Sequence, residues 1–219
     1  LLYGEGAAVT GSSNYGGQSV TLTGNFFGPD TATATSLYGG DFIDYVKYGP
    51  TGTEYSAADC TVAVAHTQIE CKTVEGVGAN LYWVIRIAGQ DSPFSSDAMS
   101  SYAPPVLDPL DPSTYVTDGN VQITIEGSNL GTIDSPIVRF GDVILADSDV
   151  VLGNGVDRIF FTLPEGKGEN IPVTVTVGGQ TSNEQLFSYE PPFIDSVHSI
   201  SDSADPTVVT VVILGRSFS

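Results

Sequence analysis

Positive charge is scarce in this sequence. Seven Lys and Arg stand against 26 Asp and Glu among 219 residues, so the formal net charge is −19 at pH 7. A surface this negative repels phosphate backbones and anionic lipid headgroups, so the composition predicts no nucleic-acid partner. No stretch approaches the roughly 18–20 consecutive apolar residues of a membrane span, so we also expect no direct membrane insertion from this part of the chain.

Cysteine and histidine are almost missing. The two cysteines, Cys60 and Cys71, lie eleven positions apart, and the two histidines are His66 and His198. A lone cysteine pair is compatible with a disulfide, two free core thiols or half of a metal site. Zinc needs further soft ligands, and the histidines lie far apart in the sequence, so we favour the disulfide. A disulfide in turn favours an oxidising, extracellular compartment.

A catalytic constellation is lacking as well. His66 has no evident serine or cysteine nucleophile beside it, and nothing resembles the G-x-S-x-G turn of hydrolases. The Gly-rich turns at 75–78 and 165–168 precede strands rather than helices, and no Lys-Ser/Thr pair follows them, which argues against phosphate binding. We therefore expect a protein that is not an enzyme.

What the sequence does contain is short runs in which apolar and polar residues alternate. Residues 19–23, 121–125 and 173–177 read SVTLT, VQITI and VTVTV, and turn-forming residues flank such runs. A period of two with many β-branched residues is typical of strands that bury one face, which predicts antiparallel sheets. The fold class is therefore all-β, and almost nothing indicates a helix. We interpret the run TATATS at 31–36 as a polar loop that could carry O-linked sugars.

The chain also repeats itself. Residues 16–28 (GGQSVTLTGNFFG) are echoed at 118–131 (DGNVQITIEGSNLG) and, more loosely, at 205–219. The shared glycine of each block is Gly24, Gly127 and Gly215. Internal repeats of this length indicate a tandem array of one structural unit.

The rest of the repeat sets the length of the unit. EGVGANLYWVIRIAGQDS at 75–92 answers EGKGENIPVTVTVGGQTS at 165–182, and SYAPPV at 101–106 answers SYEPPF at 188–193. We predict one sandwich over residues 1–103, a second over 104–190 and the opening of a third over 191–219, incomplete here. The Pro-Pro pairs at these boundaries stiffen the links, so we expect the units to be held apart as a semi-rigid rod.

The order GG-x-VTLTG-x-FFG, V-x-YG, EG-x-G and SY-x-PP resembles the IPT/TIG family of immunoglobulin-like domains, the type found in plexins and certain transcription factors. The resemblance implies tandem immunoglobulin-like β-sandwiches. Cys60 and Cys71 also resemble the cysteine pair of extracellular members, whereas the second unit has Phe161 at the position of Cys71. The family includes receptors, adhesion proteins, enzyme accessory domains and transcription factors, so it indicates fold more sharply than function. Basic loops are absent, so the DNA-binding branch is set aside.

The third unit would leave apolar side chains exposed if nothing covered them. We name these residues as a candidate assembly contact: Val208, Val209, Val211, Val212, Ile213 and Leu214. Either the rest of the repeat follows in a longer chain, or these strands complete a sandwich in a neighbouring molecule by strand addition. The first unit has a full strand set without an obvious vacancy, which favours the longer array.

Aromatic residues crowd the first unit. Trp83 alternates with Leu81 and Ile85, which predicts a place in the core. A small sandwich cannot bury the remaining aromatics together, so some must face outward as ordinary loop packing, an interface or a glycan-binding surface. These residues are Phe26, Phe27, Tyr38, Phe42, Tyr45 and Tyr48.

No cofactor is expected, and Ca²⁺ is the one metal that the pattern allows. Acidic residues gather near the two predicted boundaries and in one loop of the second unit, where oxygen-rich sites could bind calcium. The same residues also suit turns through side-chain hydrogen bonds, and no EF-hand loop is present. The candidates are Asp108, Asp111, Asp195, Asp202 and Asp205 near the boundaries and Asp142, Asp147 and Asp149 in the loop.

The leading hypothesis is a non-enzymatic structural or adhesive protein, extracellular or at the cell surface. Its tandem sandwiches would form a rod or a self-assembling fibre, with other copies or neighbouring repeats of the same chain as partners. The alternative is a binding module, either a receptor ectodomain or a carbohydrate-binding accessory domain of a larger cell-surface or secreted protein, with glycans as partners.

Overall fold

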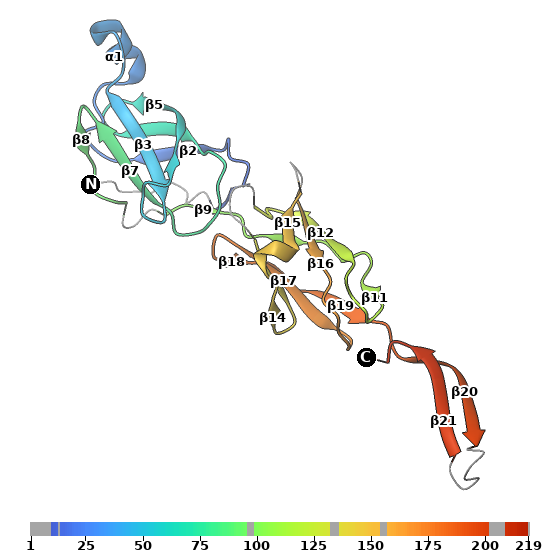
Figure 1. Cartoon of the computed structure of the whole chain (residues 1–219). Coiled ribbons are helices and arrows are strands. Elements are labelled where there is room, and N and C mark those ends of the chain that lie inside the picture. Colours follow the sequence, from blue (N-terminus) through green and yellow to red (C-terminus); the bar gives the residue numbers. More distant parts are fainter. Residues whose placement is uncertain are drawn as a thin grey trace.

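The chain folds into two β-sandwiches and a two-stranded hairpin, placed end to end (Figure 1). The computed structural model describes residues 10–12, 14–95, 99–131, 136–153, 157–201 and 209–218. Each sandwich has its own hydrophobic core. The prediction of an all-β, immunoglobulin-like fold is confirmed.

The first sandwich packs two sheets around a core that is rich in aromatic residues. Its strands are β1 (Thr10–Ser12), β2 (Ser19–Thr23), β3 (Ile43–Gly49), β4 (Tyr55–Ser56), β5 (Ala58–Val64), β6 (Gln68–Lys72), β7 (Tyr82–Ile87), β8 (Gln90–Asp91) and β9 (Ser101–Tyr102). One sheet has the order β2-β6-β5 and the other β4-β3-β7-β8. Trp83 is buried between them with Leu81 and Ile85, as predicted, and stacks on Tyr48 with ring centroids 4.2 Å apart.

A short helix corrects the reading of residues 31–36 as a polar loop. Helix α1 (Thr31–Tyr38) begins at Asp30, whose side chain accepts a hydrogen bond from the Thr33 N–H, and ends at Gly39 in the left-handed conformation. Asp30 and Gly39 are both strong capping residues, and together they stabilise a helix whose interior residues have weak helix propensity.

Among the described residues, none of the helices has the length and apolar character needed to cross a membrane.

The second sandwich repeats this plan. Its elements are β10 (Val106–Leu107), β11 (Thr114–Tyr115), β12 (Gln122–Ser128), β13 (Ile137–Phe140), β14 (Val143–Ile144), the 3₁₀ turn η1 (Asp147–Asp149), β15 (Val150–Leu152), β16 (Arg158–Thr162), β17 (Ile171–Val177), β18 (Gln180–Thr181) and β19 (Gln185–Tyr189). One sheet has the order β10-β12-β16-β15 and the other β11-β19-β17-β13-β14, with β18 added beside β17.

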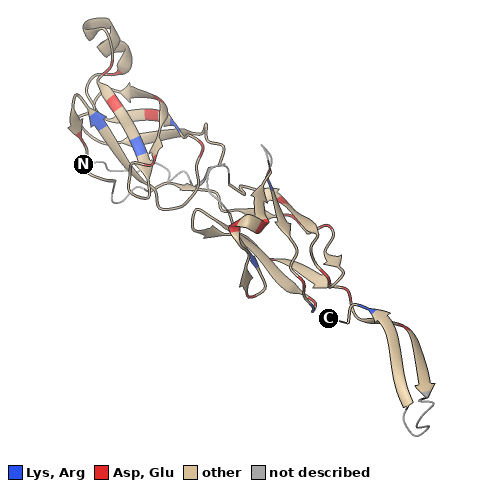
Figure 2. Ribbon diagram, in the orientation of Figure 1, with Lys and Arg blue, Asp and Glu red and all other residues tan. Residues whose placement is uncertain are grey.

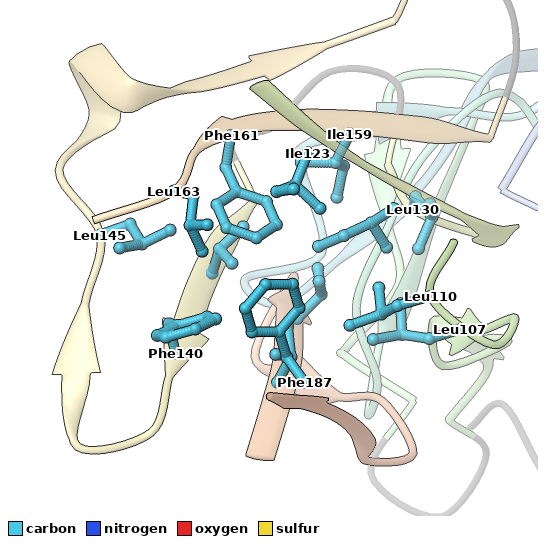
Figure 3. Packing of buried hydrophobic residues seen from close by; sticks show 14 of the residues in the cluster. Leu107, Leu110, Ile123, Leu130, Phe140, Leu145, Ile159, Phe161, Leu163 and Phe187 are labelled. Carbon is cyan, nitrogen blue, oxygen red and sulfur yellow. The ribbon is translucent and has the colours of Figure 1, made fainter. Parts of the chain in front are cut away.

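The second core is built without a disulfide (Figure 3). Phe161 pairs with Ile123 in the register in which Cys71 pairs with Val20 in the first sandwich. Phe161 is 1% exposed and also lies opposite Val150 on β15. A large apolar ring therefore occupies the site of the first sandwich's buried half-cystine.

The sheets are not purely antiparallel, which corrects one expectation. β1 pairs with β9, and β11 pairs with β19, in parallel. In the second sandwich the cause is visible: β10 joins one sheet beside β12, and the chain then crosses to the other sheet, where β11 runs in the direction of the last strand. The opening segment of the second sandwich thus supplies an edge strand to each of that sandwich's two sheets.

The repeated EG-x-G and SY-x-PP motifs meet in space. A Cβ on Gly76 would lie 2.7 Å from the Tyr102 hydroxyl oxygen, and one on Gly166 would lie 2.7 Å from the Tyr189 ring. Each glycine therefore makes room for the closing tyrosine of its sandwich. The Tyr102 hydroxyl is 2.6 Å from that of Tyr48, and burial first, then this neighbour, raises the pKa of Tyr102 far above its ordinary value.

The hairpin follows the second sandwich and contains β20 (Phe193–Ser201) and β21 (Val209–Arg216). Phe193 pairs with Arg216 and Ile194 with Gly215, as Val106 pairs with Ser128 and Leu107 with Gly127 at the start of the second sandwich. Figure 2 shows that its arms are almost free of charged residues. The hairpin thus has the pairing of the first two strands of a sandwich.

Candidate functional site: the junction between the sandwiches

The turn at residues 75–78 of the first sandwich reaches into the second. Val77, in the middle of this turn, is 3% exposed and belongs to the second sandwich's hydrophobic cluster, together with Val177 and Leu107. A buried valine contributes about 1.5–3 kcal/mol of transfer free energy. The two sandwiches are therefore in direct contact, whereas the prolines alone had predicted units that are held apart.

A glycine of the second sandwich allows this contact. Gly178, after β17, has a φ of +55°, and a Cβ there would lie 2.6 Å from the Gly78 nitrogen and 2.9 Å from the Val77 Cβ. Contacts below 3.0 Å are essentially never seen for real Cβ atoms. The backbones of the two sandwiches therefore approach as closely as they do because Gly178 carries no side chain.

Polar contacts flank the glycine pair. Gln180 donates a hydrogen bond from Nε2 to the Tyr102 carbonyl oxygen at 3.1 Å. Asn14 donates from Nδ2 to the Asn129 carbonyl oxygen at 3.0 Å, and Asn14 is 2% exposed. Because both donors are amides with fixed geometry, these bonds define the orientation of one sandwich on the other.

An ionisable pair also spans the junction. Partial burial, and then the charge and hydrogen-bonding of Asp157, raise the pKa of Tyr15. Tyr15 lies in the first sandwich and Asp157 in the second, so the neutral phenol and the carboxylate face each other across the boundary. This pair adds to the contacts between the two sandwiches.

The chain that links the sandwiches is fixed to the second of them. The amide of Asn183 accepts from the Leu107 N–H at 2.7 Å and donates to the Leu107 carbonyl at 3.0 Å. Gln185 adds a third bond to the same carbonyl, also at 3.0 Å. The segment directly after Pro104 and Pro105 is therefore anchored, and the prolines limit the freedom of the segment before it.

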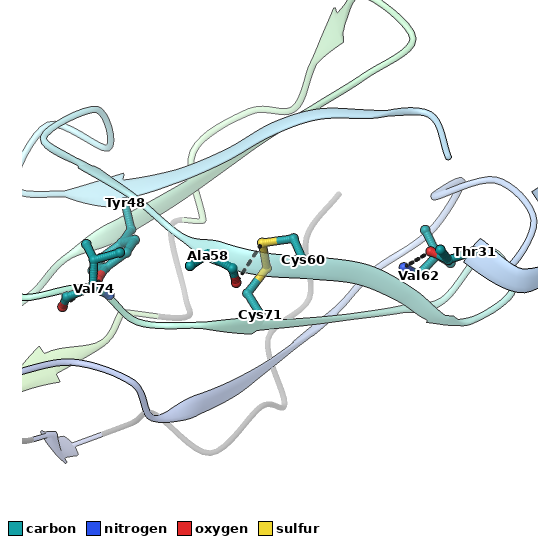
Figure 4. The surroundings of a disulfide bond; sticks show 7 residues. All are labelled: Thr31, Tyr48, Ala58, Cys60, Val62, Cys71 and Val74. Atoms are coloured by element: carbon teal, nitrogen blue, oxygen red, sulfur yellow. Dashed lines mark hydrogen bonds between the residues drawn. A yellow bond between two sulfur atoms is a disulfide. The ribbon is translucent and has the colours of Figure 1, made fainter. Parts of the chain in front are cut away.

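The structure joins Cys60 and Cys71 by a disulfide between β5 and β6 (Figure 4). Cys71 is 2% exposed and packs in the first core, beside Val62 and Ile69. The disulfide lies at the edge of the first core, with Cys60 partly buried, and takes no part in the junction.

The candidate assembly residues lie on the hairpin. Val209, Val211, Ile213 and Leu214 are each more than half exposed, and Val212 is partly buried. Val208 lies outside the described residues. Their role as an assembly contact stays a prediction.

The acidic candidates for calcium that the structure describes do not gather. Among the residues that the structure describes, no three His, Cys, Asp or Glu side chains come together as a metal-binding group. Asp202 and Asp205 lie outside those residues. Of the histidines, His66 lies in the β5–β6 turn and His198 on β20, so they belong to opposite ends of the molecule.

Sequence reasoning did not find the junction residues. The signal that could have found them is the difference between EGVG and EGKG, in which the first turn has Val77 and the second Lys167. An apolar residue at the tip of a glycine turn indicates that something covers it.

Comparison with known proteins places the second sandwich in a family. Residues 105–189 match the IPT/TIG domain model. No curated protein matches the chain significantly.

Among solved structures, the chain is similar to the Plexin A4 full extracellular region, with a TM-score of 0.36 and 23% identity over 88% of this chain and 16% of that one. It is also similar to the surface glycan-binding protein PbSGBP-B from Prevotella bryantii, with a TM-score of 0.47 and 12% identity over 84% of this chain and 42% of that one. The chain is similar as well to the I9-I11 tandem from titin, with a TM-score of 0.32 and 9% identity over 90% of this chain and 68% of that one. The chain covers 18% and 16% of the two Plexin A4 chains. Residues 105–189 of this chain belong to the IPT/TIG domain family.

Proposed function

We propose that the chain is a section of a non-enzymatic rod, in which tandem IPT/TIG-like sandwiches act as a spacer in a cell-surface or secreted protein. The observation that carries the proposal is the fitted junction, where Val77 enters the neighbouring core and Gly78 meets Gly178. A flexible tether between independent domains needs no such fit. The disulfide supports an oxidising, extracellular compartment.

The same proposal assigns boundaries near residues 103 and 190 and treats the hairpin as the start of a third sandwich. The shared pairing of Phe193 with Arg216 and of Val106 with Ser128 supports this assignment. A two-stranded hairpin is marginally stable by itself in water, so further strands must cover it. In the rod these strands belong to the same polypeptide.

A substitution at the glycine contact tests the rod. Gly178→Ala places a Cβ 2.6 Å from the Gly78 nitrogen, whereas Gly179→Ala meets nothing within 4 Å although Gly179 also has a positive φ of 77°. Both variants bear similar backbone strain, so they differ mainly in the clash at the junction. In small-angle X-ray scattering of the full chain, Gly178→Ala should broaden the distribution of interdomain distances, and Gly179→Ala should match the parent. Equal profiles for all three proteins would remove the support for a rigid rod.

A self-assembling fibre is the second candidate, and the exposed hairpin favours it. Apolar residues of both strands are open to solvent, including Val197 at 58% and Val211 at 59%. In this reading a second copy of the chain supplies the covering strands.

Electron microscopy of the full chain over a concentration series separates the two candidates. Regular filaments that disappear in Val211→Asp, but persist in the control Val143→Asp on β14, support the fibre, since Val143 is similarly exposed at 57%. Dispersed short rods at every concentration would exclude the fibre and leave the spacer.

A further inference from the structure

A groove opens in the first sandwich between the loop that follows β2 and the β7–β8 hairpin. Its volume is about 300 Å³. The loop leads into α1, at the end of the first sandwich that points away from the second (Figure 1). Its lining includes Asn25, Phe26, Ala88, Gln90, Asp91 and Ser92.

The groove is the repeat counterpart of the surface by which the second sandwich holds the first. The glycine-bounded loop GNFFG at 24–28 corresponds to GSNLG at 127–131, and IAGQDS at 87–92 to VGGQTS at 177–182. Three of the junction residues of the second sandwich described above fall in these segments. The aligned pairs are Phe26 with Asn129, Ala88 with Gly178, and Gln90 with Gln180.

The groove of the first sandwich differs from that surface in residues that prevent it from binding a turn like the one at 75–78. The junction requires glycine at 178, because a Cβ would lie 2.6 Å from a backbone nitrogen of the partner turn. The first sandwich carries Ala88 there, with a positive φ of 47°, so its Cβ fills the space that the turn would need. The groove therefore excludes the close backbone contact by which the two sandwiches dock.

Phe26 is the second change, and it is conformationally costly. Its φ is +69°, and the equivalent Asn129 and Ser217 also have positive φ values, of 56° and 57°. Asn tolerates this left-handed region and a bulky aromatic residue does not. The ring is nevertheless 88% exposed, so core packing does not compensate for the strain. Backbone strain that core packing does not offset points to a role of Phe26 in binding.

The loop that carries Phe26 is held rigidly. Gly24 donates to the Thr67 carbonyl at 3.0 Å, Phe27 donates to the His66 carbonyl at 3.3 Å, and the His66 N–H donates to the Gly28 carbonyl at 2.6 Å. The exposed ring is therefore presented on a fixed backbone. A ligand that stacks on it does not have to order the loop first, which lowers the entropic cost of binding.

The opposite side of the groove is polar and can both donate and accept hydrogen bonds. Ser92 accepts from the Ile85 N–H at 3.0 Å through its hydroxyl oxygen, and the hydroxyl proton is then available to another acceptor. Asp91 accepts from the Tyr45 hydroxyl at 2.5 Å and from Arg86 at 3.4 Å, which partly compensates its charge while leaving lone pairs. Gln90 contributes an exposed amide.

We propose that this groove binds a neutral saccharide, with a sugar ring stacked on Phe26 and its hydroxyl groups bonded to Gln90, Asp91 and Ser92. Hydroxyls both donate and accept, which matches an amide, a hydroxyl and a compensated carboxylate. The net charge of −19 disfavours polyanions. Strand addition by a peptide is disfavoured because the edge strand β8 has two residues.

The test is affinity electrophoresis of the full chain in native gels that contain dextran, hydroxyethylcellulose or galactomannan, followed by an array of neutral oligosaccharides. Phe26→Asn installs the residue that the second sandwich uses at this position. It should weaken binding at least about tenfold, the effect of losing a hot-spot aromatic, and should raise the urea midpoint because the strain is relieved. The control Phe94→Ala removes another exposed aromatic of the same sandwich, 58% exposed, and should leave binding unchanged.

Three results would overturn the proposal. The first is a chain that no neutral polysaccharide retards and no array glycan captures. The second is retention that Phe26→Asn leaves intact. The third is a self-association in sedimentation velocity that Phe26→Asn abolishes without glycan binding, since the groove would then be a protein contact.

Discussion

Reduction of the disulfide should destabilise the first sandwich and spare the second. Cys60 and Cys71 close a loop with a sequence separation of 11. The chain-entropy relation for a loop of about 11 residues gives about 9 cal/mol/K, or about 3 kcal/mol at 25 °C. With a urea m-value of about 1–1.5 kcal/mol/M, the unfolding midpoint of the first sandwich should fall by about 2–3 M.

The chain provides a reporter for this measurement. Trp83 is its single tryptophan, is 2% exposed and lies in the first core, so its fluorescence follows the first sandwich alone. Urea titrations with and without dithiothreitol should show the shift in Trp83 emission, while hydrogen exchange of the second sandwich stays constant. In a Cys60→Ala/Cys71→Ala variant the reductant should have no effect. A shift below about 0.5 M in the parent, or an equal loss of protection in β16 and β17, would refute the reasoning.

Three further predictions concern the packing and ionisation of single residues. Phe161→Ala should lower the free energy of unfolding of the second sandwich by about 3–5 kcal/mol in hydrogen exchange, and an unchanged second sandwich would contradict its core role. Gly166→Ala should cost about 1–3 kcal/mol by the same assay, because its Cβ would press on the Tyr189 ring; a neutral effect would show that the ring moves freely. The raised pKa of Tyr102 means that its stabilising contribution is complete below pH about 10 and is lost as the pH rises toward the folded-state value. Trp83 fluorescence in urea from pH 8 to 11.5 should therefore show falling stability above pH about 10, with a shallower fall in Tyr102→Phe; equal slopes would exclude Tyr102 as the cause.

The repeat made most of the fold predictable from the sequence. Gly24, Gly127 and Gly215 mark the same strand end three times, and each has a close neighbour that leaves no space for a Cβ. Trp83 was placed in the core by alternation alone. These predictions succeeded because sheet burial has a period of two that can be read locally.

Helix α1 was missed for a physical reason. Its TATAT core alternates as a strand does, and threonine has a weak helix propensity. The helix depends on its ends, where Asp30 and Gly39 cap it, so the decisive residues lie outside the alternating run.

The candidate site was the least predictable part. Val77 looks like a loop residue until the second sandwich is placed against it, and Gly178 looks like any hairpin glycine. Their importance comes from contacts between segments about 100 residues apart, which periodicity does not reveal.

Val77 also has a consequence for how such an array folds. A residue of the first sandwich completes the core of the second, so the second sandwich is stabilised by its neighbour for as long as the first stays folded. Each added sandwich is then stabilised by the free energy of its interface with its neighbour, as in a one-dimensional chain of coupled repeats. During synthesis the earlier sandwich emerges first and offers Val77 as a template on which the next can close. Under mechanical load, a sandwich flanked by folded neighbours should resist longer than one at a free end.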